Sequence, residues 1–286
     1  MYPLPGTQTT KYEVVRVSKA LSPTTLPGLD YSLNPYFGCE FNCTYCYARK
    51  YFLLREIPYK WGEYVQVKGN LPGLLEKELR KIPKGSIIGL GTSTDPYQPV
   101  EGFFRVTGRL LKVLSLRKDL RIDIQTKAAA VYNDVERIKE HGNITVGFTI
   151  LTMDEDLARI IEPRASIPRL RLKYLKKFAD EGVETWLFIG PILPYLTDSK
   201  ENLDALIEAA LEAGVKTIYT DKFRFRLGVR ENIVEALAEP FPDITRKYVI
   251  LNNERIDRLY IKAAKYVKEQ ALKHGLTYKD ETGKLG

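Results

Sequence analysis

Short apolar runs rich in β-forming residues alternate along most of this chain with amphipathic stretches of helical length. The strand-like runs are Tyr31–Tyr36, Ser86–Leu90, Leu120–Gln125, Asn143–Thr149, Glu184–Ile189 and Lys216–Tyr219. Runs this short that are apolar on both faces, such as residues 144–148, are typical of buried parallel strands. The alternation therefore predicts an α/β fold, either a parallel barrel or an open doubly wound sheet.

The intervening stretches carry apolar residues at helical spacing. They are Leu71–Lys81, Thr107–Arg117, Asp134–His141, Asp154–Ile161, Pro168–Glu181 and Ser199–Ala213. Ser199 is a candidate N-cap, and Gly182 and Gly214 are candidate C-terminal stops. The apolar side of residues 168–181 is expected to hold Leu170, Leu172, Leu175 and Phe178.

The expected domain organisation has three parts. Residues 1–30 form a loop-rich lead, in which prolines interrupt regular structure at Pro3, Pro5, Pro23 and Pro27. Residues 31–225 form the core barrel, and residues 226–286 form a C-terminal helical extension. Within the extension, Asp257–His274 is expected to be a long basic helix with Leu259, Ile261, Ala264 and Val267 on its apolar side.

The formal net charge is +8 and the sequence pI is about 9.1. This charge favours anionic partners such as nucleic acid. Equally, it fits a solvated surface rich in Lys and Glu in a heat-adapted protein. No apolar run reaches the roughly 18 residues of a membrane span, and the N-terminal residues lack the pattern of a secretory signal. We expect a soluble, cytoplasmic monomer without a membrane partner.

The three cysteines of the chain, Cys39, Cys43 and Cys46, fall within eight residues. An odd number so tightly clustered is not a disulfide framework, and a zinc site would normally need four ligands. The loop follows the first predicted strand, so it lies on the catalytic face of a parallel barrel. Thiolates are the natural ligands of iron–sulfur clusters. Three of them leave one iron of a cubane cluster open to a small molecule.

The spacing C-x3-C-x2-C, with Tyr45 as the aromatic residue before the last cysteine, resembles the signature of the radical S-adenosylmethionine (SAM) superfamily. The resemblance implies a [4Fe-4S] cluster on the three cysteines and SAM on its open iron. One electron from an external donor, such as ferredoxin or flavodoxin, then cleaves SAM to methionine and a 5′-deoxyadenosyl radical. The radical abstracts hydrogen from the substrate.

Further segments resemble the spore photoproduct lyase-like family, often labelled DNA repair photolyase. They are Thr94–Glu101 (TDPYQPVE), Asn34–Cys39, Gln125–Lys127, Glu162–Ala165 with Arg169 and Leu170, and Gly190–Pro194. Together these segments run from about residue 31 to residue 220. The resemblance implies a partial (β/α)6 barrel of the radical SAM type, with the cofactor at the carboxyl ends of the strands.

The resemblance also implies contacts to the cofactor. The Tyr45 backbone and Ile189 or Ile192 would meet the adenine, Ser93 or Thr94 the methionine or ribose, Lys127 the methionine carboxylate or ribose hydroxyls, and Thr149 the ribose. Glu162 and Arg164 would contact the cofactor or form a structural ion pair with each other. Lys127 could equally be a solvated lysine, and Thr149 an ordinary strand residue.

Catalytic roles are expected for Thr92, Asp95 and Tyr97, although Asp95 could merely start a turn before Pro96. In spore photoproduct lyase a cysteine after the second strand returns a hydrogen atom to the repaired thymine. Thr92 takes that place here, and its stronger O–H bond argues against the same relay. Nearby tyrosines, Tyr36, Tyr47 and Tyr97, could carry hydrogen instead.

Residues 222–226 interleave basic and aromatic side chains after the last predicted strand. They fit phosphate contacts with base stacking, helped by Arg105, Arg109 and Arg230, or an edge strand with a solvated charged face. Three functions stay open: a radical enzyme acting on nucleic acid or a nucleotide, a radical enzyme acting on a protein or small metabolite, and a non-catalytic iron–sulfur or zinc protein that binds nucleic acid.

Overall fold

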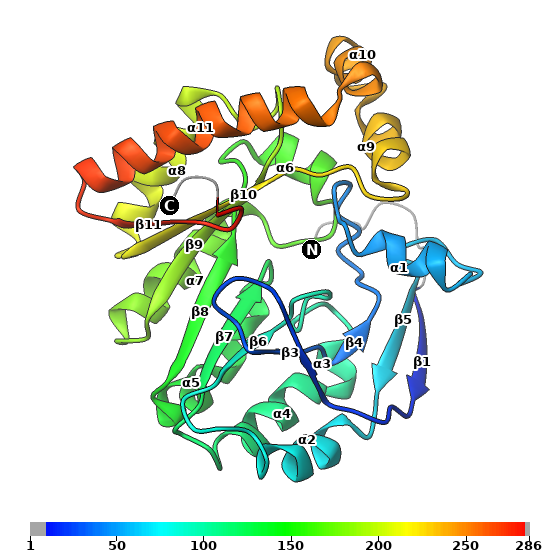
Figure 1. Ribbon diagram of the computed structural model, residues 1–286, viewed down its shortest axis with the longest axis vertical. Helices are drawn as coiled ribbons and strands as arrows, with labels where there is room; N and C mark the ends of the chain where they lie inside the picture. The colour runs from blue at the N-terminus through cyan, green and yellow to red at the C-terminus, as the bar shows by residue number, and fades with distance from the viewer. Residues whose placement is uncertain (1–9, 284–286) are drawn as a thin grey trace.

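A computed structural model describes residues 10–283 of the chain (Figure 1). The expected absence of a secretory signal, and the loop around Pro3 and Pro5, lie outside the described residues. The main sheet has eight strands in the order β11-β10-β9-β8-β7-β6-β3-β2. Their bounds are β2 Leu21–Pro23, β3 Tyr31–Leu33, β6 Ile87–Leu90, β7 Arg121–Thr126, β8 Ile144–Thr149, β9 Thr185–Ile192, β10 Thr217–Lys222 and β11 Thr277–Asp280.

All neighbours in this sheet pair in parallel except β2 and β3. Every residue of β8 is buried, as expected of a parallel strand covered on both faces. Five of the six predicted strand runs are therefore confirmed as single strands, with ends shifted by a few residues. Tyr31–Tyr36 is the exception, because it divides into β3 and the start of β4 (Tyr36–Phe37).

Helices follow the outer side of the curved sheet (Figure 1), and this arrangement is the predicted partial barrel. They are α2 Leu71–Leu79, α3 Glu101–Phe104, α4 Val106–Leu114, the 3-10 helix η1 Ala129–Asp134, α5 Val135–His141, α6 Glu155–Ile161, α7 Pro168–Asp180 and α8 Lys200–Glu212. The predicted cap is confirmed, because Ser199 Oγ accepts a hydrogen bond from the Asn202 N–H at 3.2 Å. None of the described helices is long and apolar enough to cross a membrane.

The inward faces of two helices differ from the prediction. On α7, Leu175 and Phe178 are buried, but Leu170 and Leu172 are only half-buried. Pro168 and Arg171 take the remaining inward positions, because spacings of three and four residues share one helix face. On α11 (Asn253–Lys273), Ala264 and Val267 are buried, whereas Leu259 and Ile261 are half-buried. The other inward residues of α11 are Ile256, Tyr260, Ala263 and Ala271.

The lead is more regular than predicted. Lys11–Val15 forms β1, which pairs in parallel with β5 (Tyr64–Lys68), and β5 pairs with β4 in a second sheet of order β1-β5-β4. Strand β2 ends at Pro23 and pairs with β3. Residues 16–20 and 24–30 are loops as expected, but the two strands β1 and β2 were not predicted. These strands gain their order from partners distant in sequence, which local patterning does not reveal.

The C-terminal part contains α9 (Val229–Leu237), α10 (Pro242–Ile250) and α11, as a helical extension should. It also supplies β11, which adds in parallel to the edge of the main sheet beside β10. The extension is therefore not purely helical. The division of the chain at residues 30 and 225 stays a prediction.

Close packing of the sheet can be tested at Gly147, in the middle of β8. A Cβ atom on Gly147 would lie 2.2 Å from the Trp186 ring of β9. We expect Gly147→Ala to lower the free energy of unfolding by about 1–3 kcal/mol in denaturant titrations, because the core must shift to admit the methyl group. Gly73→Ala is the matched control, since Gly73 lies in α2 with nothing within 4 Å of its added Cβ. Equal stability of the two variants would contradict this packing.

Candidate functional site

The three cysteines lie in the loop between β4 and α1 (Arg49–Leu54). Cys39 and Cys43 are buried and Cys46 is half-buried. The loop turns at Gly38, whose φ is +92°. A Cβ there would lie 2.5 Å from the Tyr64 carbonyl oxygen, so this close approach of β5 requires glycine.

Side chains of the TDPYQP segment hold the loop in place. The Gly38 carbonyl accepts hydrogen bonds from Thr94 Oγ1 at 2.6 Å and from Gln98 Nε2 at 3.2 Å. The Glu40 N–H donates to Gln98 Oε1 at 2.8 Å, and Glu40 Oε1 accepts the Val100 N–H at 2.7 Å. The TDPYQP segment, which resembles the lyase-like family, thus fixes the position of the cysteine loop through hydrogen bonds.

The residues of the loop fit a bound cluster. The charges of Cys43 and Cys46 raise the pKa of Cys39, and that of Cys46 raises the pKa of Cys43, so the thiols lie near one another. Burial raises the pKa of Cys39 well above its usual value, that of Cys43 to about 12, and that of Cys46 as well. Thiols in such a place need a positive partner before they ionise, and iron provides one. Beside them, Arg49 Nε is buried without a hydrogen-bond acceptor.

In the described part of the chain, no three His, Cys, Asp or Glu side chains are grouped so that they could hold a metal ion directly. A cubane cluster makes a different demand, because its thiolates bind separate irons at three corners. The ligands therefore need not converge on one point.

Asp95 joins the ends of two strands. Its carboxylate accepts hydrogen bonds from Thr126 Oγ1 and the Lys127 N–H, both at 2.7 Å, and from the Tyr97 N–H at 2.9 Å. The predicted turn is present, and it also ties the segment after β6 to the end of β7. The Tyr97 hydroxyl donates to Asp134 at 3.2 Å. The side chains of Asp95 and Tyr97 are both buried, and their hydrogen bonds hold the segment after β6 in place.

A buried polar chain continues from the cysteine loop to the end of β8. The Tyr45 hydroxyl donates to Glu162, which forms an ion pair with Arg171. The side chains of Glu162 and Arg171 are 2% and 1% exposed. Arg171 also donates to the Thr149 carbonyl at 2.8 Å. Lys127 Nζ lies 5.8 Å from the centre of the Tyr45 ring, so the segments that follow β7 and α6 and the end of β8 come together beside the cysteine loop.

The alternative of a Glu162–Arg164 ion pair is wrong. Arg164 donates to the Gly62 carbonyl at 2.9 Å, and Glu162 pairs with Arg171 instead. Residues 162–165 form bends and a turn before α7 begins at Pro168, and this arrangement brings Arg171, rather than Arg164, to the carboxylate. The sequence could have indicated that Arg171 is buried, because it falls on the same helical stripe as Pro168, Leu175 and Phe178.

Thr92 and Ser93 lie at the end of β6, next to Asn34. The Asn34 side chain donates to Thr92 Oγ1 and accepts from the Ser93 N–H, both at 2.9 Å. The Tyr47 hydroxyl donates to the Thr92 carbonyl. Thr149 accepts a hydrogen bond from Gln125 at 3.2 Å, and Ile189 and Ile192 are buried in β9. The contacts of these residues to a cofactor stay predictions.

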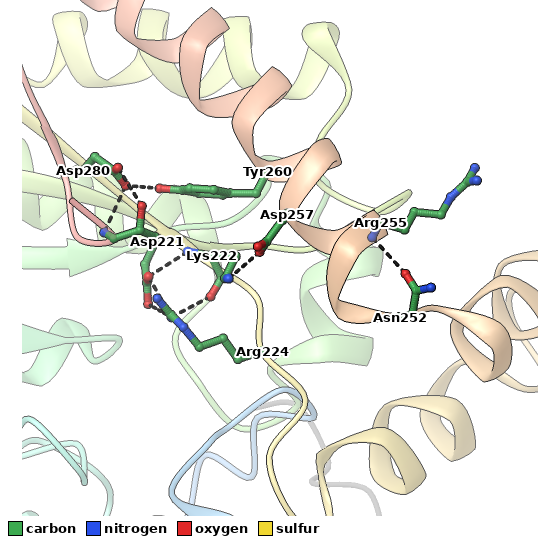
Figure 2. Close-up of polar contacts among 9 residues, drawn as sticks. Asp221, Lys222, Arg224, Asn252, Arg255, Asp257, Tyr260 and Asp280 are labelled. Carbon is green, nitrogen blue, oxygen red and sulfur yellow. Dashed lines mark hydrogen bonds and ion pairs between the residues drawn. The ribbon is translucent and has the colours of Figure 1, made fainter. Parts of the chain in front are cut away.

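The basic segment after β10 differs from the predicted rim. Lys222 is paired with Asp257, and Arg224 with Asp221 (Figure 2). Phe223 is buried, with its ring edge on Phe225. Arg230 lies 3.6 Å above the Phe225 ring and donates to carbonyls at the end of α10, while the exposed Arg109 donates to the carbonyls of Arg105 and Phe104. Phe223 is therefore not available for base stacking, and the nearest charges are largely neutralised.

A partial parallel barrel with a three-cysteine loop at the carboxyl ends of its strands defines a class of enzymes that work through an iron–sulfur cluster. The sequence model described as "Radical SAM superfamily" matches residues 33–209, more than half of the chain. The chain belongs to this superfamily, as the cysteine spacing predicts. The cofactors of the superfamily are a [4Fe-4S] cluster and SAM.

The chain is also similar to several uncharacterized proteins. One from Methanocaldococcus jannaschii is 37% identical over 191 residues, which is 66% of this chain and 71% of the relative. One from Mycobacterium bovis is 29% identical over 224 residues, 76% of this chain and 66% of the relative. One from Acidianus two-tailed virus is 27% identical over 218 residues, 72% of this chain and 71% of the relative. The chain thus spans about two thirds of the length of these relatives.

Among solved structures, spore photoproduct lyase complexed with a dinucleoside spore photoproduct is similar with a TM-score of 0.72. The match covers 98% of this chain and 87% of that chain at 15% identity. SuiB of Streptococcus suis, bound to SAM, has a TM-score of 0.53 and covers 87% of this chain and 49% of that chain at 14% identity. At these identities the likeness shows the fold alone, and it confirms the predicted barrel.

The Glu162–Arg171 pair can be tested by removing one partner. We expect Arg171→Met to lower the free energy of unfolding of the metal-free protein by about 3–5 kcal/mol, because the Glu162 carboxylate is left buried and unpaired. Adding Glu162→Gln should recover part of that loss. Arg169→Met is the control, since the exposed Arg169–Glu155 pair should contribute less than about 1 kcal/mol. Similar losses for Arg171→Met and Arg169→Met in denaturant titrations would contradict the buried pair.

Proposed function

We propose that this protein is a radical SAM enzyme that abstracts hydrogen from a nucleic acid or nucleotide. The proposal is supported chiefly by the likeness over nearly the whole chain to spore photoproduct lyase, a protein solved with a dinucleoside photoproduct. The net charge of +8 agrees with an anionic substrate. An external one-electron donor is required as a partner.

In this proposal Cys39, Cys43 and Cys46 ligate the cluster. When bound, the reduced cluster supplies the electron that cleaves SAM to methionine and the 5′-deoxyadenosyl radical. The protein binds and orients SAM, with the Lys127 ammonium positioned for the methionine carboxylate. The other proposed contacts are Tyr45, Ser93, Thr94, Thr149, Glu162, Arg164, Ile189 and Ile192. Apolar β9 side chains and the buried loop keep water from the reacting atoms.

The return of hydrogen to a product radical would differ from the thiol relay of spore photoproduct lyase. Thr92 stands at the position of the donor cysteine, and its O–H bond is too strong for efficient transfer. Of the three candidate tyrosines, Tyr36 and Tyr97 are buried, with their hydroxyls on Glu101 and Asp134. Tyr47 is exposed and lies beside Thr92. We therefore keep the substrate class but not the spore photoproduct reaction.

A protein or small metabolite is the second candidate substrate. One observation favours it, because Lys222 and Arg224, which follow the last barrel strand, are neutralised by Asp257 and Asp221. A nucleic acid would then have to be held elsewhere. A non-catalytic iron–sulfur protein that binds nucleic acid is disfavoured by membership in a superfamily of enzymes.

The activity is tested anaerobically with cluster-loaded protein, a chemical reductant and SAM. We expect release of 5′-deoxyadenosine, with deuterium transferred to it from deuterated oligonucleotides or nucleotides rather than from deuterated peptides. The Cys43→Ala variant should release only background amounts. If the loaded protein released no 5′-deoxyadenosine, the radical assignment would be wrong. Deuterium transfer from peptides alone would support the second candidate.

The cluster ligands are tested separately by absorption and by iron and sulfide analysis. Single changes of Cys39, Cys43 or Cys46 to Ala should abolish the brown chromophore, because a cubane held by two thiolates in this loop lacks a third anchor. Thr92→Ala, at the end of β6, should retain it. A full cluster in Cys43→Ala would rule out the ligand assignment.

A further inference from the structure

Lys68 is the last residue of β5, and Asn34 connects it to the segment that follows β6. Its Nζ donates to the Asn34 carbonyl at 2.8 Å. The side chain of the same Asn34 holds Thr92 Oγ1 and the Ser93 N–H. The ammonium group is therefore separated by one residue from the proposed SAM contact at Ser93 and from Thr92, the position of the hydrogen donor in the lyase.

Arg55 brings a second positive charge to this place. It follows α1, and its guanidinium carbon lies 4.4 Å from the centre of the Phe37 ring. Phe37 faces Gln66 across the β4–β5 pair, and side chains at Gln66 and Lys68 project from the same face of a strand. Lys68 and the Phe37 ring, on which Arg55 lies, thus share one face of the small sheet. The Phe52 ring of α1 stacks on the Phe37 ring with 5.2 Å between the ring centres, which holds Phe37 in place.

Within residues 10–283, neither cation has a carboxylate within ion-pair distance. Glu13, on the neighbouring strand, accepts the Tyr64 hydroxyl instead. Burial and the charge of Arg55 together lower the pKa of Lys68 to about 8. Two cations held together without an acid repel each other, and a bound anion would remove that repulsion. Lys222 and Arg224 at the end of β10, by contrast, already have acid partners (Figure 2).

We propose that Lys68 and Arg55 form a phosphate-binding site that holds a backbone phosphate of the substrate beside the nucleotide under attack. The identification of the anion as a phosphate of nucleic acid or a nucleotide rests on the proposed function. Arg55, held flat on Phe37, can present two N–H groups to phosphate oxygens, and Lys68 adds a point charge. Lys222 and Arg224, by contrast, are each bonded to an acid at the end of β10.

The first experiment measures the affinity of the holoenzyme for a labelled oligothymidylate as a function of salt. Lys68→Gln and Arg55→Gln should each weaken binding about tenfold, because each removes a charge-assisted hydrogen bond. Each should also reduce the slope of log affinity against log salt by about 0.7, the value of one single-strand phosphate contact. Lys84→Gln is the matched control, since Lys84 is exposed before the start of β6, at the opposite end of the strand from Thr92. It should change neither quantity.

The second experiment needs no nucleic acid. Lys68 of the wild-type holoenzyme is acylated near pH 8, where its amine is partly neutral, and the modified peptide is quantified by mass spectrometry. Inorganic phosphate or pyrophosphate should slow the modification of Lys68 but not that of Lys84. SAM affinity should be unchanged in Lys68→Gln. If Lys68→Gln impaired SAM binding instead, the anion would be the methionine carboxylate and the phosphate site would be wrong.

The two experiments separate this proposal from the proposed function. Protection of Lys68 by phosphate without any oligothymidylate binding would support the anion site and count against a nucleic-acid substrate. Salt-dependent oligothymidylate binding that is identical in the wild type, Lys68→Gln and Arg55→Gln would overturn the anion site and leave the substrate class standing. If neither phosphate nor pyrophosphate slowed the acylation of Lys68, the anion site would also be overturned.

Discussion

The hydrogen bonds that the TDPYQP segment makes to the cysteine loop are the constraint on which the site depends. The loop between β4 and α1 has little regular structure, so Thr94 and Gln98 determine the position of the Gly38 carbonyl and the Glu40 N–H. All of these groups are buried, and leaving them without partners would cost more than an ordinary surface contact. Through Asp95 the same segment is bonded to the end of β7. One short stretch therefore fixes the cysteine loop relative to the carboxyl end of β7.

Three charged side chains, Glu162, Arg171 and Lys127, lie in the interior near those cysteines. Glu162 is neutralised by Arg171 and bonded to Tyr45, which belongs to the cysteine loop. Lys127 is different, because its pKa is raised by Cys43, Glu162 and Asp95 against the opposing effect of burial, and it lies over the Tyr45 ring. It therefore remains a cation beside the cysteine loop, where we propose that it meets the SAM carboxylate. The described interior thus pairs the charges of Glu162 and Arg171 and leaves Lys127 charged next to the thiols.

Around the site, some cations are paired with acids and others are not. At the β10 end, the Lys222–Asp257 pair and the Phe223 ring join the strand to the C-terminal helices, while Arg224 is paired locally with Asp221 of the same strand (Figure 2). At the β4–β5 end, Lys68 and Arg55 share no acid. A basic sequence is a weak guide to a binding surface for this reason, since only the charges that the fold leaves unpaired can attract a substrate.

The sequence by itself determined the features that depend on neighbouring residues. Strand runs such as 144–149, the Ser199 cap and the three thiols within one loop are local, because periodicity, capping and ligand spacing act over a few residues. Only the tertiary structure decided which distant groups meet. It placed β1 and β11 on sheet edges, gave Glu162 the partner Arg171 rather than Arg164, and paired the cations at β10 while leaving Lys68 and Arg55 without an acid. The strand pairings and the Lys222–Asp257 pair join residues far apart in the chain. The energies of all these contacts depend on burial and distance, which local sequence patterns do not contain.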